Sequence, residues 1–354
     1  MFKRENTMLN KLIVPLISIL FGFILGALVM LLFGYNPIDA YNAMLTSVLT
    51  NPYFFGEALR QAVVLTFTGL GFNMAYQAGF FNIGIAGQML LGWLTSIWFA
   101  LMFPDLPRLL SVPLFLIIGL LAGAIWAGIA GFLRAYFGTN EVIVTIMLNY
   151  TALHFSNYMI RNVLATGNRT ALVGENASLA LGWLSALTGG SRLNLGLFLA
   201  LAAVILYWFT MKHTTVGFEL RAVGLNKDAA EYAGMSSKKN IILSMFLSGA
   251  LAGLGGAIQG LGTFRNIFVQ SALPTEGFDG IAVALLGLGN PFGTFLASIL
   301  LGILDIGAGF MPNSAGVPDE LADVIVASII FFIGANYIIR RLFNRKTVKG
   351  GEAR

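Results

Sequence analysis

The chain has no cysteine and only two histidines in 354 residues. The missing cysteines exclude disulfides, thiolate metal sites and cysteine nucleophiles. His154 and His213 are far apart in the sequence and have no companion ligands, so we expect no metal site. A Gly-x-x-x-x-Gly-Lys-Ser/Thr motif is also absent, as is any Ser-His-Asp or paired-carboxylate pattern. These absences predict a chain that is not an enzyme and hydrolyses no nucleotide itself.

Charge is scarce as well, because Asp, Glu, Lys and Arg make up 10% of the chain, against about 25% in an ordinary soluble domain. Hydrophobic residues make up 57%, and the mean hydropathy is +0.81. A helix needs about 20 mostly apolar residues to cross a bilayer. The candidate spans are residues 12–34, 61–80, 84–103, 111–133, 141–160, 195–211, 240–262, 278–290, 293–311 and 321–340. The sequence therefore predicts an all-α polytopic membrane protein of about ten transmembrane helices, some of them short or broken.

We expect one transmembrane domain over residues 1–354 rather than several folded domains. Its first helix is predicted at 12–34, because this apolar run is too long for a signal peptide. The tail at 341–354 is basic and is expected at the anionic lipid of the inner leaflet. A weak echo between residues 79–87 and 277–284 indicates two pseudo-repeat halves.

The basic residues favour one orientation in the membrane. An even number of spans puts both termini on the same side. If that side is the cytoplasm, 15 of the 21 Lys and Arg residues lie inside and 6 lie outside. The positive-inside rule therefore predicts a multi-pass protein of the cytoplasmic membrane with both termini cytoplasmic. The net charge of +5 does not indicate a nucleic-acid partner, because the basic residues are divided among several loops.

Residues 212–240 form a polar, charged island, KHTTVGFELRAVGLNKDAAEYAGMSSKKN, between two apolar segments. The predicted orientation places this island in the cytoplasm. From Glu219 to Ala233 it predicts a short helix with a small-residue face, ended by Gly234. Such a helix can dock in a groove of a partner while its charges stay in water. The alternative is a solvated helix that lies on the membrane surface.

Polar side chains inside predicted spans are costly and often mark a function. Those near the two echoing segments, or on the span 141–160, are Asn82, Gln88, Asn149, Glu276 and Asp279. Interrupted segments in the two halves of a transporter point to a substrate site near the middle of the membrane. The alternative is structural, since amides and hydroxyls also bond helices to one another and cap broken helix ends. Both interpretations stay open at this stage.

Four glycines lie on one face of the span 240–262, at i, i+4, i+7 and i+11. They are Gly249, Gly253, Gly256 and Gly260. Such a stripe of small residues predicts close contact with neighbouring helices rather than binding of a ligand.

Several segments resemble permease subunits of bacterial ABC importers, in the branched-chain amino acid/ribose permease superfamily. The island GFELRAVGLNKDAAEYAGMS at 217–236 resembles their cytoplasmic coupling loop. GFFNIGIAGQMLLG at 79–92, NEVIVTIMLNY at 140–150 and GFDGIAVALLGLGNPFGT at 277–294 resemble further segments of that superfamily, in the right order. The combination is similar to the nucleoside-uptake branch, including its guanosine-type permeases.

The resemblance implies a permease that carries nucleosides, purine-type above all, by alternating access. It also implies three partners: a cytosolic ABC ATPase that uses ATP, a second permease subunit, and an extracytoplasmic substrate-binding lipoprotein. No cofactor is expected in this chain. The residues expected to couple to the ATPase are Glu219, Arg221, Asn226, Ala229, Ala230 and Gly234. The alternatives are a sugar permease of the same superfamily, or a proton-coupled secondary transporter that uses Glu276, Asp279 and Asp305.

Overall fold

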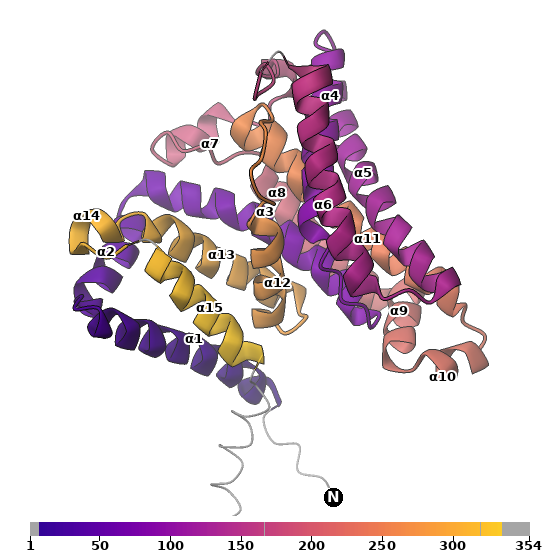
Figure 1. The fold of residues 1–354 in the computed structure, drawn as a ribbon, viewed down its shortest axis with the longest axis horizontal. Helices are drawn as coiled ribbons and strands as arrows, with labels where there is room; N and C mark the ends of the chain where they lie inside the picture. The colour runs from indigo at the N-terminus through magenta and orange to yellow at the C-terminus, as the bar shows by residue number, and fades with distance from the viewer. Residues whose placement is uncertain (1–6, 166, 319, 335–354) are drawn as a thin grey trace, which may run out of the picture. The chain divides into compact units, whose positions relative to one another are not determined.

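Most of the part of the chain that the structure describes is helical. The computed structural model describes residues 7–165, 167–318 and 320–334, and in these ranges the only β-structure is isolated bridges. Figure 1 shows the helices coloured along the chain. The predicted all-α fold is confirmed for these residues.

The chain divides into two compact units, which we describe separately. One consists of residues 1–54 and 303–354, and the other of residues 55–302. The expectation of one transmembrane domain stays a prediction, as do the pseudo-repeat halves. The basic tail at 341–354 lies outside the described residues.

The first unit is built from helices at the two ends of the chain: α1 (Thr7–Leu32), α2 (Pro37–Thr50), α14 (Met311–Ala315) and α15 (Glu320–Gly334). α1 packs closely on α15, since Gly22 of α1 lies against Ile329 of α15. A side chain at position 22 would have no room there. α2 begins at an Asn-Pro pair. The Oδ1 atom of Asn36 accepts a hydrogen bond from the Ile38 N–H at 3.0 Å, as a helix-capping asparagine does.

The second unit is a bundle around one long helix. Its main helices are α3 (Pro52–Gln77), α4 (Ile85–Met102), α5 (Arg108–Phe137), α6 (Glu141–Met159), α8 (Gly196–His213), α11 (Ser237–Ile258), α12 (Glu276–Leu286) and α13 (Pro291–Ala308). The boundaries of the units fall within α3 and α13. α3 is buried on all sides from Ala58 to Ala75 apart from two half-buried positions, Leu59 and Gln61, and is therefore its central helix.

α4, α5 and α11 are held together by glycines. Gly253 packs against the backbones of Gly92 and Gly123, and Gly249 also packs against Gly123. Gly256 lies against the carbonyl of Met89. A Cβ atom has no room at any of these contacts, so only glycine permits the approach. The predicted packing role of the glycine stripe is confirmed.

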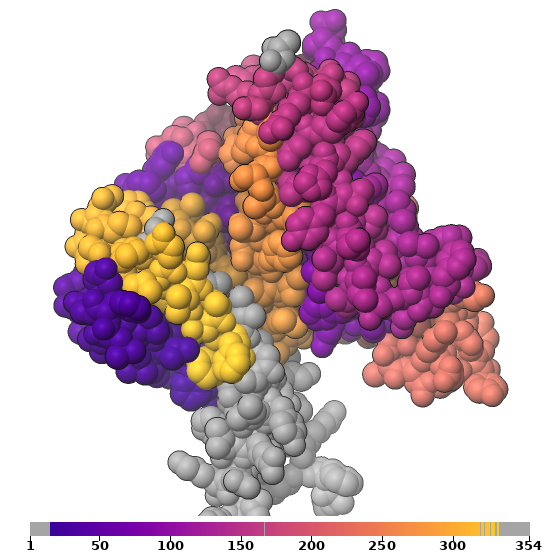
Figure 2. All heavy atoms as spheres, in the orientation of Figure 1, coloured from indigo at the N-terminus to yellow at the C-terminus, as the bar shows by residue number. Residues whose placement is uncertain are grey.

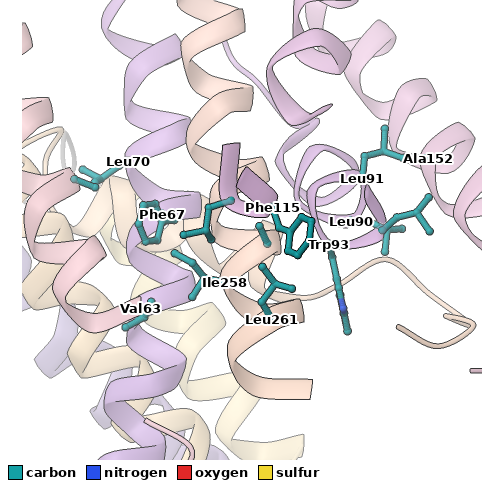
Figure 3. Close-up of a cluster of buried hydrophobic side chains, with 14 of the residues drawn as sticks. Val63, Phe67, Leu70, Leu90, Leu91, Trp93, Phe115, Ala152, Ile258 and Leu261 are labelled. Carbon is teal, nitrogen blue, oxygen red and sulfur yellow. The ribbon is translucent and has the colours of Figure 1, made fainter. Parts of the chain in front are cut away.

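A large apolar core joins four of these helices. Figure 3 shows Phe67 of α3, Trp93 of α4, Phe115 of α5 and Ile258 of α11 in this core. The indole of Trp93 also donates its N–H to the carbonyl of Asn266 at 2.9 Å. The polar end of this buried ring is therefore satisfied.

The outward faces of the second unit are apolar. α5 exposes a stripe spaced by three or four residues: Leu114, Ile117, Leu121, Ile125, Ile129 and Phe132. α8 exposes Phe198, Leu201, Ile205 and Phe209 in the same way. Continuous apolar faces of this size are rare on soluble monomers, but they suit contact with lipid. The chain is a multi-pass membrane protein.

Six of the predicted spans are helices long and apolar enough to cross a membrane. They are Pro15–Leu32, Ile85–Met102, Arg108–Phe137, Gly196–His213, Ser237–Phe264 and Pro291–Ala308. The predicted spans 61–80 and 141–160 correspond to α3 and α6, which are more polar, while 278–290 corresponds to the short α12. The predicted total of about ten crossings is therefore not established by helix length and composition.

A segment without long helices, residues 167–195, packs on the end of the bundle in the second unit. It contains η2 (Glu175–Ala177) and α7 (Gly182–Leu187). The side-chain amide of Asn176 donates to the carbonyls of Pro104 and Leu106 at 2.6 and 2.8 Å. The Thr170 N–H also donates to the Ile267 carbonyl at 2.9 Å. These hydrogen bonds satisfy backbone N–H and C=O groups that lie outside helices and therefore have no partner within a helix.

Candidate functional site

The two segments that echo each other in the sequence lie in direct contact. Gly277, in the first turn of α12, packs against the backbone of Ala86 in the first turn of α4. Gly280 packs against Thr68 of α3 in the same way. The structure thus brings the two segments into contact without a space between them.

Asn82 and Gln88 bond to each other at the beginning of α4. The Nδ2 of Asn82 donates to Gln88 Oε1 at 3.0 Å, and Gln88 Nε2 donates to Asn82 Oδ1 at 3.1 Å. Asn82 Nδ2 also donates to the hydroxyl of Ser248 at 2.8 Å, and that hydroxyl donates to the Gly71 carbonyl at 2.6 Å. The pair therefore links α3, α4 and α11.

Asn149 of α6 caps the start of α4. The first N–H groups of a helix have no partner within the helix, and Gly84, which precedes α4, provides no side-chain cap. The Oδ1 of Asn149 accepts from the Gly87 N–H at 2.8 Å, and its Nδ2 donates to the Ile83 carbonyl at 2.9 Å. One amide from a neighbouring helix thus fixes the turn that enters α4.

These three amides support the structural interpretation that the sequence left open. Asn82, Gln88 and Asn149 are at most 2% exposed, and each bonds to partners within the chain. They hold an irregular segment in a membrane-embedded bundle, where an unpaired polar group is costly. Their contact with a substrate stays a prediction.

Glu276 and Asp279 lie in the first turn of α12, where the helix dipole favours carboxylates. Glu276 accepts a hydrogen bond at 2.9 Å from Nε2 of Gln259, a side chain that is 3% exposed. Gln259 begins η3, a π-helical turn (Gln259–Phe264) that continues α11. Such turns are frequent at functional sites. The sequence analysis did not select Gln259, because a lone glutamine in an apolar span carries no distinguishing pattern.

The charged island at residues 212–240 forms two helices, α9 (Thr215–Leu225) and α10 (Lys227–Tyr232). The prediction of one helix from Glu219 to Ala233 was therefore wrong. Asn226 interrupts it with an extended backbone, φ −159° and ψ 107°, and its Oδ1 accepts from the Ala229 N–H at 3.0 Å. Asparagine is among the preferred N-cap residues, so it starts a new helix there.

The end of α10 agrees with the prediction that Gly234 stops the helix. Its φ is +84°, a left-handed conformation that glycine adopts without strain. The Met235 N–H then donates back to the Ala230 carbonyl at 3.0 Å. A return bond from beyond the glycine is a common way to satisfy the last carbonyls of a helix.

The outward surface of α9 and α10 includes Ala229, Ala233 and Gly234 of the expected small-residue face, but not Ala230. Ala230 is 4% exposed and thus faces inward, whereas Ala229 is exposed. The most exposed large apolar side chains of α9 and α10 are Tyr232, 95% exposed, and Leu225, 88% exposed. Figure 2 shows α9 and α10 as a projection at one end of the second unit. Sequence reasoning missed these two residues, although each stands out as a large apolar side chain in a polar island.

α9 is attached to the bundle by specific contacts. The side-chain amide of Asn240 in α11 donates to Glu219 Oε2 at 3.0 Å. Gly224 packs against the backbone of Gln77 and Ala78 at the end of α3. Arg221 donates its Nε–H to the Gly217 carbonyl within α9 at 3.1 Å. Of the predicted coupling residues, Glu219 and Arg221 are half-buried, while Asn226, Ala229 and Gly234 lie on the exposed surface.

A buried charge cluster near the start of α3 attaches the segment 167–195. Glu57 accepts from Arg60 Nε at 2.7 Å, from Arg192 Nη2 at 2.9 Å, and from the Arg192 backbone N–H at 2.7 Å. Burial alone would raise the pKa of Glu57. The hydrogen bonds from Arg192 and the charge of Arg60 outweigh burial and hold this pKa below its ordinary value. Glu57 is therefore ionised at neutral pH.

The comparisons with known proteins agree with a membrane transport protein. A family model described as branched-chain amino acid transport system / permease component matches residues 54–334. Because this range is most of the chain, the protein belongs to that family. It is the permease component of an ABC transport system and not an enzyme.

The chain is similar over nearly its whole length to named relatives. It is 48% identical to the nucleoside ABC transporter permease protein NupB of Lactococcus lactis subsp. cremoris (strain MG1363), over 98% of each chain. It is 46% identical to the guanosine ABC transporter permease protein NupP of Bacillus subtilis (strain 168), over 97% of this chain and 98% of NupP. It is 32% identical to the glucose ABC transporter permease protein TsgB13 of Haloferax volcanii, over 92% of this chain and 88% of TsgB13.

In two of these species a second permease protein is also similar. NupC of Lactococcus lactis is 26% identical over 80% of this chain, and NupQ of Bacillus subtilis is 25% identical over 73%. The relatives therefore occur as pairs of different permeases. No solved structure matches the chain.

Proposed function

We propose that this chain is the permease subunit of an ABC importer that carries nucleosides, purine-type above all, across the cytoplasmic membrane. The observation that carries the proposal is the identity of 48% and 46%, over nearly the full length, to permeases named for nucleosides and guanosine. The site adds support, because the carboxylates Glu276 and Asp279 in the first turn of α12 suit a ligand with hydroxyl groups and base edges.

ATP is used by a separate cytosolic ATPase in this proposal, and the chain itself holds no cofactor. The support is the sequence, which has no phosphate-binding loop of the Walker type. Transport then requires a surface through which the ATPase acts on the permease.

We assign that surface to α9 and α10. All residues from 224 to 234 are exposed except Ala230. Tyr232 and Leu225 provide apolar contacts, and aromatic anchors of this kind are enriched among the residues that dominate binding energy. The hydrogen bond from Asn240 to Glu219 and the packing of Gly224 on α3 connect this surface to the bundle.

The remaining partners follow from an importer of this kind. A second, different permease subunit is supported by the pairs NupB with NupC and NupP with NupQ. An extracytoplasmic lipoprotein would capture the substrate and deliver it at the side opposite to α9 and α10. The charge distribution supports cytoplasmic termini, with residues 162–194 outside.

We place the substrate path at the start of α12, with Glu276 and Asp279 in contact with the substrate. Helix starts within the membrane are where transporters commonly hold polar substrate groups. Asn82, Gln88 and Asn149 hold the adjoining start of α4, so their substitution would change the path through its shape.

A sugar is the second candidate substrate, because a relative named for glucose transport is 32% identical over 92% of this chain. Uptake into a strain that lacks its own nucleoside and glucose transporters separates the two. The gene is expressed with its neighbouring transport genes, and uptake of labelled guanosine, adenosine, glucose and leucine is measured. Uptake of nucleosides but not of glucose is expected, and the reverse pattern would refute the nucleoside proposal.

A further inference from the structure

The carbonyl oxygen of the Gln259 side chain has no hydrogen-bond partner in the described part of the chain. The side chain is 3% exposed, and its other end is fixed by the bond from Nε2 to Glu276. Most buried side-chain polar atoms in native proteins have a partner, so an unpaired acceptor requires an explanation. This one occurs beside Glu276, where the substrate path is proposed.

The orientation of the amide follows from its neighbour. If the Gln259 oxygen and nitrogen exchanged places, the oxygen would face the Glu276 carboxylate, which has no proton to donate when it is ionised. The observed bond therefore assigns Nε2 to Glu276 and leaves Oε1 as the acceptor. An amide oxygen and a carboxylate lie side by side here, and together they offer only acceptors to a ligand.

We propose that Gln259 and Glu276 bind adjacent hydroxyl groups of the transported nucleoside's ribose, one hydroxyl donating to each residue. The inference rests on the proposed function and names the part of the substrate that this site recognises. Vicinal hydroxyls bring two donors on neighbouring carbons, and a carboxylate that accepts from a ribose hydroxyl is an established mode of recognition. Gln259 is then a residue that determines specificity.

The access of the substrate to this oxygen depends on the connection between η3 and α12. Residues 265–275 between them contain no helix, and Ser271, Ala272 and Thr275 in this connection are exposed. A non-helical connection lets the first turn of α12 move away from Gln259 without breaking either helix. The structure then represents the closed arrangement, in which Gln259 Oε1 is sealed.

Two substitutions separate substrate binding from a purely structural role. Gln259→Leu removes both ends of the amide. Gln259→Glu keeps an acceptor oxygen and the length of the side chain, and it either loses the donor or shares a proton with Glu276. Gln270→Leu is the matched control, because Gln270 lies in the connecting segment and only its backbone forms hydrogen bonds among the described residues.

The measurement is the ratio of guanosine uptake to 2′,3′-dideoxyguanosine uptake, with inosine as a third substrate, at equal membrane abundance. Any capture protein is the same in all strains, so it does not affect the comparison between variants. Gln259→Leu should lower the ratio about two- to tenfold, the effect of one hydrogen bond, while Gln259→Glu and Gln270→Leu keep it. The ratio of guanosine to inosine, which differ only in the base, should not change.

Three results would overturn the proposal. An unchanged ratio in Gln259→Leu would show that the amide does not contact ribose. An equal loss in Gln259→Leu and Gln259→Glu would show that the bond to Glu276 is all that matters. A change in the guanosine-to-inosine ratio alone would assign an acceptor to the 2-amino group of guanine, which inosine lacks. If the wild-type protein takes up no nucleoside at all, the proposed function itself fails, which is a distinguishable outcome.

Discussion

The side-chain oxygen of Asn149 in α6 accepts a hydrogen bond from the Gly87 N–H in α4, with 2.8 Å between Oδ1 and N. Gly87 lies in the first turn of α4, where the helix itself offers no acceptor for this N–H. Replacement of Asn149 by Ala should leave the Gly87 N–H and the Ile83 carbonyl buried without partners. A lost cap costs about 1 kcal/mol and a buried unpaired group about 1–3 kcal/mol. We therefore expect Asn149→Ala to lower the Tm of the purified protein in detergent clearly.

Two variants control this prediction. Asn149→Asp keeps the acceptor for Gly87 and should lower the Tm less. Asn162→Ala removes only an exposed bond to the Tyr158 carbonyl and should leave the Tm nearly unchanged. Equal Tm values for Asn149→Ala and the wild type would show that the cap does not stabilise α4.

The orientation can be tested with single cysteines, because the chain has none. Leu172 is 66% exposed in the segment 167–195, and Tyr232 is 95% exposed at the end of α10. With an impermeant thiol reagent on intact cells, Leu172→Cys should react, whereas Tyr232→Cys should react only after permeabilisation. The opposite pattern would invert the proposed topology. Asn176 and Ser237 are less suitable positions for a labelled cysteine. The side chain of Asn176 donates hydrogen bonds to two carbonyls, and Ser237 is only 1% exposed.

Coupling to the proposed ATPase should depend on the two most exposed apolar residues of the charged island at 212–240, Leu225 and Tyr232. Tyr232→Ala combined with Leu225→Ala should weaken co-purification of the ATPase and transport together, while the Tm stays near that of the wild type. Loss of an aromatic anchor costs about 2 kcal/mol, or roughly 30-fold in affinity. Tyr158→Ala on α6, which is 61% exposed, is the matched control and should co-purify normally. If the ATPase co-purifies with the double variant as well as with the wild type, α9 and α10 do not form the contact with the ATPase.

The charge cluster around Glu57 makes stability depend on pH. The pKa of Glu57 is lowered in the folded protein from its ordinary value of 4.5, so its contribution is fully present above that value. The contribution is lost as the pH falls from 4.5 through the lowered pKa, because protonation breaks the bonds to Arg60 and Arg192. Glu57→Gln should lose on the order of 3 kcal/mol at neutral pH, since Arg60 stays buried without its partner.

The measurement is the Tm of the wild type and of Glu57→Gln in detergent between about pH 7 and about pH 3. The difference between the two proteins should shrink as the pH falls below 4.5. A difference that stays constant over this range would show that the charge of Glu57 is not what stabilises the cluster.

Apolar patterning made the helical fold predictable, because lipid-exposed stripes such as Leu114 to Phe132 leave a strong signal in the sequence. The packing role of the glycine stripe was also predictable, because its spacing places the four glycines on one face of a helix. The break at Asn226 was missed although asparagine is a preferred cap, since the surrounding residues are all compatible with one helix.

Partners that are distant in the sequence were not predictable. Nothing local pairs Asn149 with Gly87, or Asn82 with Ser248, because their positions relative to each other arise only when the helices pack. The inward position of Ala230 and the outward position of Ala229 have the same origin, since adjacent alanines differ only in what lies next to them. The unpaired oxygen of Gln259 likewise requires a structure to be noticed.

The glycine contacts among α4, α5 and α11 also determine which parts can move. Backbones that touch at Gly92, Gly123, Gly249 and Gly253 leave no layer of flexible side chains to absorb sliding or rotation. These three helices should therefore travel as a single rigid body during a transport cycle, with hinges only where the chain is non-helical. The connection at residues 265–275 is such a place, so a displacement of α9 by a bound partner would reach Glu276 as a movement of α4, α5 and α11 together against α12.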